Sequence, residues 1–289
     1  MPKWRYALRL AYHGGAFRGF QRQPGLPTVQ GALEDALSHL GSRVRVEPAA
    51  RTDAGVHALS QVVTFGAPVD VDPAELRAMV NARTPDSILC VEAARAAPAL
   101  HARASATSRT YVYLVGWPAP AELREFAWSL PDGRAFPGLE APRLDLARAA
   151  AALALAVGEH DFGGFARPGE QTARRVRDPL ATTARLLRAE ILPAAASPLV
   201  AIVIEGRSFL RAMVRHLVGT VVTAAVGRAE PSRVAEILAS PGSRYRGVRA
   251  PAWGLTLAKV SYPRSPFPGL PARTAPGTRG TPGSDPAPP

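Results

Sequence analysis

The sequence has very little cysteine and no long hydrophobic run. Cys90 is the single cysteine among 289 residues, which excludes a disulfide within one chain and a metal site of clustered cysteines. It lies in an apolar stretch, so we expect a small buried side chain. The most apolar run, residues 217–226, is about half the length of a membrane span, and the amino terminus lacks a signal-peptide core. We therefore expect a soluble cytoplasmic protein with no membrane partner.

Lysine is nearly absent, because Lys3 and Lys259 are its only occurrences. Almost all of the positive charge is therefore arginine, and 35 basic against 23 acidic side chains give a formal net charge of +12. A codon preference could explain arginine in place of lysine, since alanine is also abundant, but it explains the excess over acid less well. Arginine binds phosphate bidentately and stacks on bases. The charge thus indicates a polyanionic partner.

The first third of the chain predicts a β-α-β-β-α-β order. Residues 4–12 alternate apolar and basic side chains, which is typical of a strand with one buried face. Helical spacing predicts a helix from Thr28 that ends at Gly41, and Asp72-Pro73-Ala74-Glu75 is a capping sequence that begins a second helix. Further strands are expected at 43–47, 58–66 and 88–91. This is the order of ferredoxin-like and RNA-recognition folds.

The rest of the chain repeats this order with one additional helix. Strands are expected at 110–115, 181–192, 199–205 and 253–260, helices at 144–157, 208–226 and 231–240, a loop at 158–165 and an insertion at 117–142. The sequence therefore predicts an α+β fold in two halves, residues 1–105 and 106–262. Residues 263–289 are rich in proline and glycine and predict a disordered tail.

One loop, residues 51–58, combines a carboxylate with an arginine at a tight turn. Its sequence is Arg-Thr-Asp-Ala-Gly-Val-His-Ala, and it lies between two predicted strands. Asp53 can bond its own backbone and Gly55 tolerates positive φ, as a turn requires. An isolated Asp-x-Gly is most often a solvated turn, but a turn held between strands can also present a side chain rigidly.

The whole octad resembles the catalytic loop of the tRNA pseudouridine synthase A family. Other family motifs follow in the same order along the chain: residues 20–23, 29–34, 80–82, 101–107, 109–113, 161–165, 209–219 and 250–255. The resemblance spans residues 5–262. It departs from the family at Phe20, where tryptophan is usual, and at Ala212, where a polar side chain is frequent.

The resemblance implies an isomerase that converts uridine to pseudouridine at positions 38–40 of the tRNA anticodon arm. It implies the pseudouridine synthase fold, in which an extended mixed or antiparallel sheet joins two ferredoxin-like or RNA-recognition-like halves around a central basic cleft. It also implies a homodimer bound to tRNA, with no metal and no organic cofactor. Asp53 is then the catalytic nucleophile or base. Attack on the sugar, attack on the base and removal of a sugar proton all stay open.

The resemblance assigns three further residues to the substrate site. Arg215 matches the arginine that pairs with the catalytic aspartate, and on the predicted 208–226 helix it would share a face with Arg211. Arg51 matches the arginine that holds RNA beside the target nucleotide. Tyr111 matches the tyrosine that stacks on the target uracil, which must be flipped out of a stem. The alternatives are a solvated arginine, a turn-stabilising arginine and a core tyrosine.

Two further arginines are expected to contact RNA phosphates. Arg18 and Arg22 lie in a predicted loop and are expected to position the RNA through phosphates, so binding should weaken steeply with salt. One alternative is a synthase of the same fold acting at another RNA position. The other is a non-catalytic RNA-binding protein, for which the sequence lacks the usual aromatic ribonucleoprotein signatures. The histidines are interpreted as structural or RNA-contacting: His57, His101, His160 and His216.

Overall fold

The computed structural model describes residues 4–41, 44–140, 143–166, 181–195 and 197–267. Its central feature is a ten-stranded sheet in the order β4-β1-β3-β10-β5-β9-β8-β7, with β2 beside β3 and β6 beside β5. The strands are β1 Trp4–Tyr12, β2 Glu47–Pro48, β3 His57–Ala67, β4 Ile88–Arg95, β5 Ser108–Gly116, β6 Ala127–Ser129, β7 Gly158–Asp161, β8 Thr183–Pro193, β9 Leu199–Gly206 and β10 Leu255–Ser261. The α-helices are α1 Val29–Ala36, α2 Pro73–Arg83, α3 Leu146–Ala154, α5 Met213–Ala225 and α6 Arg233–Leu238.

Two units of the sheet share one strand order. The strands β4-β1-β3-β2 are antiparallel neighbours in the first half, and β10-β5-β9-β8 are antiparallel neighbours in the second. Each unit follows the fourth-first-third-second order of a ferredoxin-like fold. Parallel pairing of β10 with β3 joins the units into one mixed sheet. The predicted α+β fold is therefore confirmed, and the predicted division near residue 105 lies in the connection between β4 and β5.

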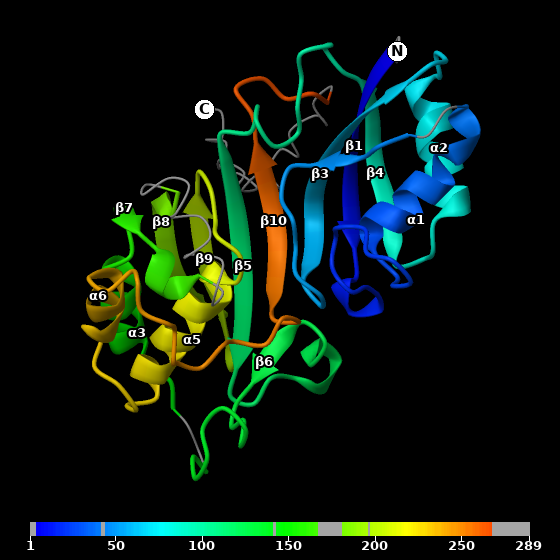
Figure 1. Cartoon of the computed structure of the whole chain (residues 1–289). Helices are drawn as coiled ribbons and strands as arrows, with labels where there is room; N and C mark the ends of the chain where they lie inside the picture. The colour runs from blue at the N-terminus through cyan, green and yellow to red at the C-terminus, as the bar shows by residue number, and fades with distance from the viewer. Residues whose placement is uncertain (1–3, 42–43, 141–142, 167–180, 196, 268–289) are drawn as a thin grey trace, which may run out of the picture.

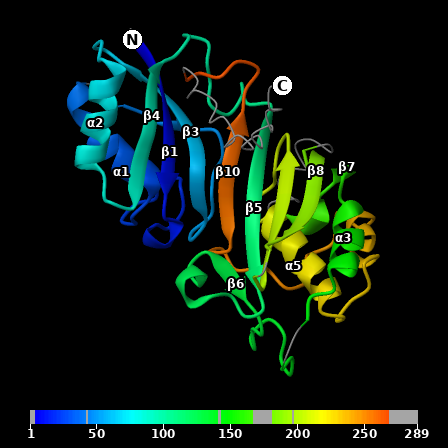
Figure 2. The same ribbon diagram turned by 180° about the vertical axis from the view of Figure 1, so that it is seen from behind.

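The helices form two groups on either side of the central strands. Figure 1 shows α1 and α2 beside the first-half strands and α3, α5 and α6 beside the second-half strands, with β10 and β5 between them. Figure 2 shows the strands side by side when the molecule is seen from behind. Within the described residues, no helix is long and apolar enough to cross a membrane. The site described below lies between the two groups of helices.

Of the expected strand at 43–47, the described residues 44–46 are not in a strand. Within the described residues 44–48, only Glu47 and Pro48 pair with β3. The Val46 N–H donates to Glu34 Oε1 at 3.1 Å, and the Val46 carbonyl accepts from Gln30 Nε2 at 3.2 Å. Side chains of α1 thus satisfy the backbone groups that a neighbouring strand would otherwise bind.

Three other boundaries differ from the sequence prediction. The helix expected from residue 208 begins at Met213, because Ala212 has a left-handed backbone with φ 62°. The expected loop at 158–165 contains the edge strand β7, whose polar sequence carries no hydrophobic alternation. The insertion at 117–142 contains β6, which pairs with β5 and places Trp128 in the core.

The last strand and the start of the tail also differ from the sequence prediction. The strand β10 begins at Leu255 rather than Trp253, and its register shifts between Leu257 and Lys259, so Val260 is buried and Lys259 is exposed. Phe267 is buried, and the Arg9 guanidinium lies 5.8 Å from its ring centroid. Most of the predicted tail, residues 268–289, lies outside the described residues.

Candidate active site

A tight turn presents Asp53 just before the start of β3. The Val56 N–H donates to the Asp53 carbonyl at 3.1 Å, and Gly55 has φ 81°, the positive value that a type II turn requires at this position. A Cβ on Gly14 would overlap the Val56 carbonyl, so a second loop packs directly against the turn. The predicted turn is present, and its tight packing fixes the direction of the Asp53 side chain.

Buried hydrogen bonds hold Thr52, the residue that precedes Asp53. The hydroxyl groups of Thr52 and Tyr12 lie 2.8 Å apart, and Gln61 Nε2 donates to the Tyr12 hydroxyl at 3.3 Å. The Phe20 N–H donates to the Thr52 carbonyl at 3.0 Å. Burial raises the pKa of Tyr12 to about 12, so this hydroxyl is a neutral partner. Thr52, next to Asp53, is consequently bonded to β1 and to the loop that contains Phe20, and β3 supports the Tyr12 hydroxyl.

Two arginines of the second half face the Asp53 carboxylate. Arg211 Nε lies 3.5 Å from Oδ1, and Arg215 Nη1 lies 3.8 Å from Oδ2. The Arg215 side chain is only 11% exposed and donates from Nε to the Ala250 carbonyl at 2.8 Å, whereas Arg211 is 56% exposed. Burial lowers the pKa of Arg215, as does nearby Arg249, while Asp53 raises it. The structure thus brings the predicted Asp53 and Arg215 together, although Arg211 precedes the helix rather than lying on it.

All six predicted site residues line one cleft of about 1290 Å³. Among the described residues that line it, Asp53 is the only one with a carboxylate. Eight arginines line it: Arg18, Arg22, Arg51, Arg103, Arg109, Arg207, Arg211 and Arg215. A cleft with this excess of positive charge attracts a polyanion and is well suited to phosphate groups.

Tyr111 supplies an aromatic group to the cleft. Its ring meets Phe209 edge to face, with centroids 5.1 Å apart. Burial raises the pKa of Tyr111 above its ordinary value, so the phenol stays protonated. The neighbouring Tyr113 does not line the cleft, because it packs against Trp128 and donates its hydroxyl to the Pro251 carbonyl at 2.9 Å. The structure therefore distinguishes two tyrosines that the sequence places on the same face of one strand.

The predicted phosphate-contacting arginines differ in their partners. Arg18 and Arg51 are exposed, and among the described residues their side chains have no ion-pair partner. Arg22 lines the cleft but pairs with Glu34 at 3.0 Å and with Asp35 at 2.7 Å. An RNA phosphate would have to compete with both carboxylates for Arg22.

Arg109 is a buried cleft residue for which the sequence predicts no role. Its guanidinium group donates to four backbone carbonyls, those of Ala49 at 3.0 Å, Arg103 at 2.6 Å, Ala106 at 3.4 Å and Arg207 at 2.8 Å. Burial lowers the pKa of this guanidinium. Its position two residues before Tyr111 on β5 was a usable signal, because an arginine on a central strand is seldom solvated.

The geometry of the cleft suits a long polyanion with one nucleotide brought close to a carboxylate. The surrounding arginines can hold phosphates, while Asp53 can reach only the nucleotide that enters between them. The aromatic ring of Tyr111 offers a face or edge to a base that has left its stack. The fold and the site thus fit a class of protein, the enzymes that modify nucleic acids.

Comparison with known proteins specifies the family within this class. The family model described as tRNA pseudouridine synthase matches residues 10–104 and 152–263. The tRNA pseudouridine synthase A of Frankia casuarinae is 40% identical over 91% of this chain and 90% of its own length. Those of Thermosipho africanus and Geobacillus kaustophilus are 33% and 36% identical, over 89% and 88% of this chain and 99% and 92% of their own. The chain belongs to the tRNA pseudouridine synthase family, a family of isomerases, as its motifs predicted.

Proposed function

We propose that this chain isomerises uridine to pseudouridine at positions 38–40 of the tRNA anticodon arm, with Asp53 as the catalytic nucleophile or base. The observation that carries the proposal is the single carboxylate of an arginine-lined cleft, held between Arg211 and Arg215. Tyr111 lines the same cleft. These residues are the family motif positions, and they come from both halves of the fold.

The reaction exchanges one bond for another and needs no redox step. The bond between C1′ and N1 of the uridine breaks, the uracil rotates, and C5 bonds to C1′. The proton leaves C5 and N1 ends protonated, so the product has the composition of the substrate. Asp53 serves the bond exchange as a carboxylate, and the guanidinium groups of Arg211 and Arg215 face it. Tyr111 receives the flipped base, and Arg51 holds the adjacent backbone.

The proposal extends to the assembly and its location. We propose a cytoplasmic homodimer with one tRNA lying across both subunits, because the family resemblance implies it. Residues 1–105 and 106–262 are proposed as the two halves of each subunit, since the connection between β4 and β5 separates two units of equal strand order. Light scattering of the purified protein would give twice the mass of the chain.

The substitution Asp53→Asn tests the catalytic assignment. It removes the ionised carboxylate and retains the shape of the side chain, so pseudouridine formation in a tRNA assay should fall by at least about 10³-fold. Binding of tRNA should survive, because an amide opposes phosphate less than a carboxylate does. The measurement pairs product analysis with a filter-binding assay on the same preparation.

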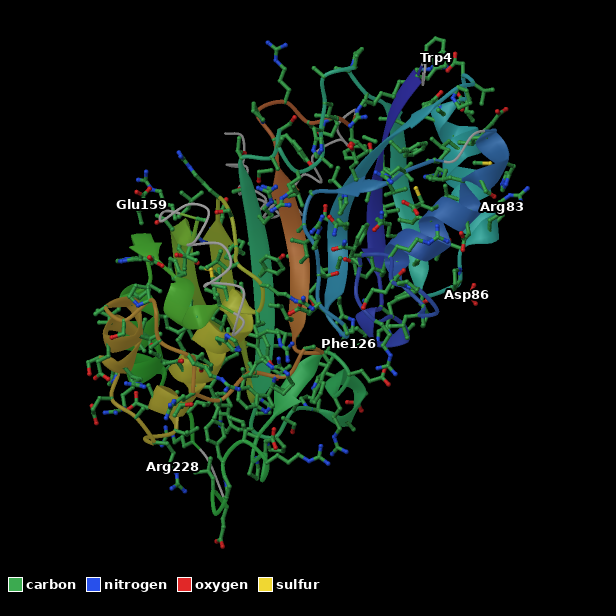
Figure 3. The ribbon with its side chains drawn as sticks, viewed as in Figure 1. Trp4, Arg83, Asp86, Phe126, Glu159 and Arg228 are labelled. Atoms are coloured by element: carbon green, nitrogen blue, oxygen red, sulfur yellow. The ribbon has the colours of Figure 1, made fainter. Side chains whose placement is uncertain are left out.

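Asp86→Asn is the matched control for this substitution. Asp86 is exposed just after α2, as Figure 3 shows, and does not line the cleft. The control should keep full activity. Product at the wild-type rate from Asp53→Asn would remove Asp53 from the chemistry and would favour another group in the cleft.

Mapping of pseudouridine separates the proposed function from its alternatives. In tRNA from a strain lacking the protein, uridines 38–40 should be unmodified while other pseudouridines persist. Loss of pseudouridine at another position would identify a same-fold synthase with a different target. An unchanged tRNA would favour the RNA-binding alternative, against which family membership already argues.

A further inference from the structure

We propose that a second basic surface, outside the cleft, binds the sugar-phosphate backbone of the same tRNA. The surface consists of Arg244, Arg246 and Arg249 and is called the basic strip below. The inference rests on the proposed function, because tRNA is the polyanion it invokes. Its own support is the way in which one loop is fixed along α5.

Tyr245 anchors the loop that carries the strip. The Tyr245 hydroxyl donates to the Val248 carbonyl at 2.8 Å and to the His216 carbonyl at 3.0 Å as alternative acceptors, and lies 2.9 Å from Thr220 Oγ1. Its ring stacks on His216 with centroids 4.2 Å apart. A Cβ on Gly219 would overlap the Val248 carbonyl, so the loop lies directly on the helix. The loop is therefore held in place before any ligand arrives, which lowers the entropic cost of binding.

The arginines on either side of this anchor have free guanidinium groups. Arg244, Arg246 and Arg249 are exposed, and none of them makes a side-chain hydrogen bond or ion pair with another described residue. Arg244 and Arg246 line a hollow of about 330 Å³, and no described residue of its lining has a carboxylate. The other cation of the hollow, Arg233, pairs with Glu236 at 2.7 Å. Exposed arginines without counter-ions on a fixed loop suit phosphate oxygens.

The strip is continuous with the active-site cleft. The Ala250 N–H donates to the Arg215 carbonyl at 3.1 Å, and the charge of Arg249 lowers the pKa of Arg215. From Arg215 the loop follows α5 to Thr223, which lines the hollow. Eight residues of helix span roughly 12 Å. Phosphates on a strand that leaves the cleft along α5 would therefore meet the strip within a few nucleotides.

The double substitution Arg244→Ala/Arg246→Ala tests the strip. At about 0.1 M salt, the Kd for full-length tRNA should rise about tenfold, and the slope of log Kd against log salt should fall by about 2. The loss should appear in KM rather than kcat, because neither arginine lines the active-site cleft. Arg244→Lys/Arg246→Lys keeps both charges and should recover most of the affinity.

Arg77→Ala/Arg83→Ala is the charge-matched control. Both arginines are exposed on α2, which lies at the opposite side of the molecule from α6 (Figures 1 and 3). The control should bind tRNA as the wild type does. Thermal melting of each variant identifies any loss of fold, and the lysine pair keeps the test valid if the alanine pair melts early.

The outcomes for the strip and for the proposed function are separable. If the alanine pair binds tRNA with the affinity and salt slope of the α2 control, the strip does not contact the substrate. If the wild type forms no pseudouridine in tRNA, the proposed function fails, whatever the binding data show. Weakened binding confined to the strip variants, with product formed by the wild type, supports both.

Discussion

Arg109 is charged and buried, yet backbone carbonyls rather than carboxylates surround it. Ala49 belongs to the first half, and Arg207 directly follows β9 in the second, so one guanidinium group bonds both walls of the cleft. The planar group can direct its five N–H donors to several acceptors at once, which an ammonium group cannot do. Arg109 is therefore a positioning residue that sets the spacing between the turn of Asp53 and the segment of Arg211.

The substitution Arg109→Lys should keep the charge but lose part of this spacing. A lysine cannot satisfy all four carbonyls, so the free energy of unfolding should fall by about 1–3 kcal/mol. At a temperature where the variant is fully folded, kcat should fall at least about tenfold, because the two walls no longer share one donor group. Stopped assays of pseudouridine and thermal melting give the two quantities.

Arg148→Lys provides the matched control for Arg109. Arg148 also donates to two carbonyls, those of Ala224 at 3.1 Å and Ala229 at 2.8 Å, but at the far end of α5 from the cleft. Its substitution should lower stability with little effect on kcat. Equal effects of the two lysine variants on kcat would show that Arg109 contributes only to stability.

The sequence predicts the identity of the site residues better than it predicts their partners. The turn at Asp53 follows from Gly55, whose positive φ the sequence suggests directly. The pairing of Arg22 with Glu34 and Asp35 does not follow, because the loop and α1 meet only in the folded chain. Side-chain partners on different elements depend on tertiary packing, which local sequence patterns do not predict.

At the scale of elements, the segment after β5 supports the turn that contains Asp53. His57 accepts from the Gly14 N–H at Nδ1 and lies 3.1 Å from the Glu125 carbonyl through Nε2. The ring of Phe126 covers it with centroids 4.8 Å apart. The predicted insertion thus contacts the loop that holds Asp53, and Figure 3 shows Phe126 where the lower end of β3 meets this segment.

These contacts require a neutral His57 and predict an acid-sensitive fold. Burial, and then the charge of His13, lower the pKa of His57, while Glu125 raises it. The unfolded chain therefore binds the proton more readily than the folded chain does. The stability that neutral His57 contributes is fully present above the unfolded-state pKa of about 6.5, and it is lost as the pH falls below that value. The Tm should consequently decrease between about pH 7 and pH 5.

The variant His57→Asn isolates this contribution. Asparagine offers an acceptor for the Gly14 N–H and does not titrate, so its Tm should depend less on pH than that of the wild type. His216 has a pKa that burial lowers as well, and it should leave a residual dependence in the variant. If the Tm of the variant changed with pH as much as the Tm of the wild type, a role for His57 would be contradicted.

Element order could be predicted from the sequence, whereas several boundaries could not. Alternation in β1 and the capping sequence of α2 are local signals, and both elements occur where expected. The start of α5 depends on the left-handed Ala212, a conformation that alanine rarely adopts. The edge strand β7 is polar, and only its pairing with β8 defines it.

At the scale of the whole molecule, the positive charge is concentrated where a substrate would lie. Apart from Arg109, which donates to backbone carbonyls, four cleft arginines have no carboxylate partner among the described residues: Arg18, Arg51, Arg103 and Arg207. The basic strip continues this surface along α5. The parallel pairing of β10 with β3 places the turn of Asp53 and the start of α5 on opposite walls of one cleft. Part of the formal net charge of +12 thus lies on one continuous surface of the folded chain.

This distribution predicts a steep salt dependence of tRNA binding. If the four unpaired cleft arginines, together with Arg244 and Arg246, each meet a phosphate, log Kd should change with log salt with a slope of about 5. Affinity should then fall about a thousandfold between 50 and 200 mM salt, measured by filter binding with the inactive Asp53→Asn variant. A slope near 1 would mean that stacking and hydrogen bonds dominate, and that most of these arginines face solvent in the complex. Because the slope counts contacts rather than affinity, it tests the charge distribution of the whole molecule independently of the chemistry at Asp53.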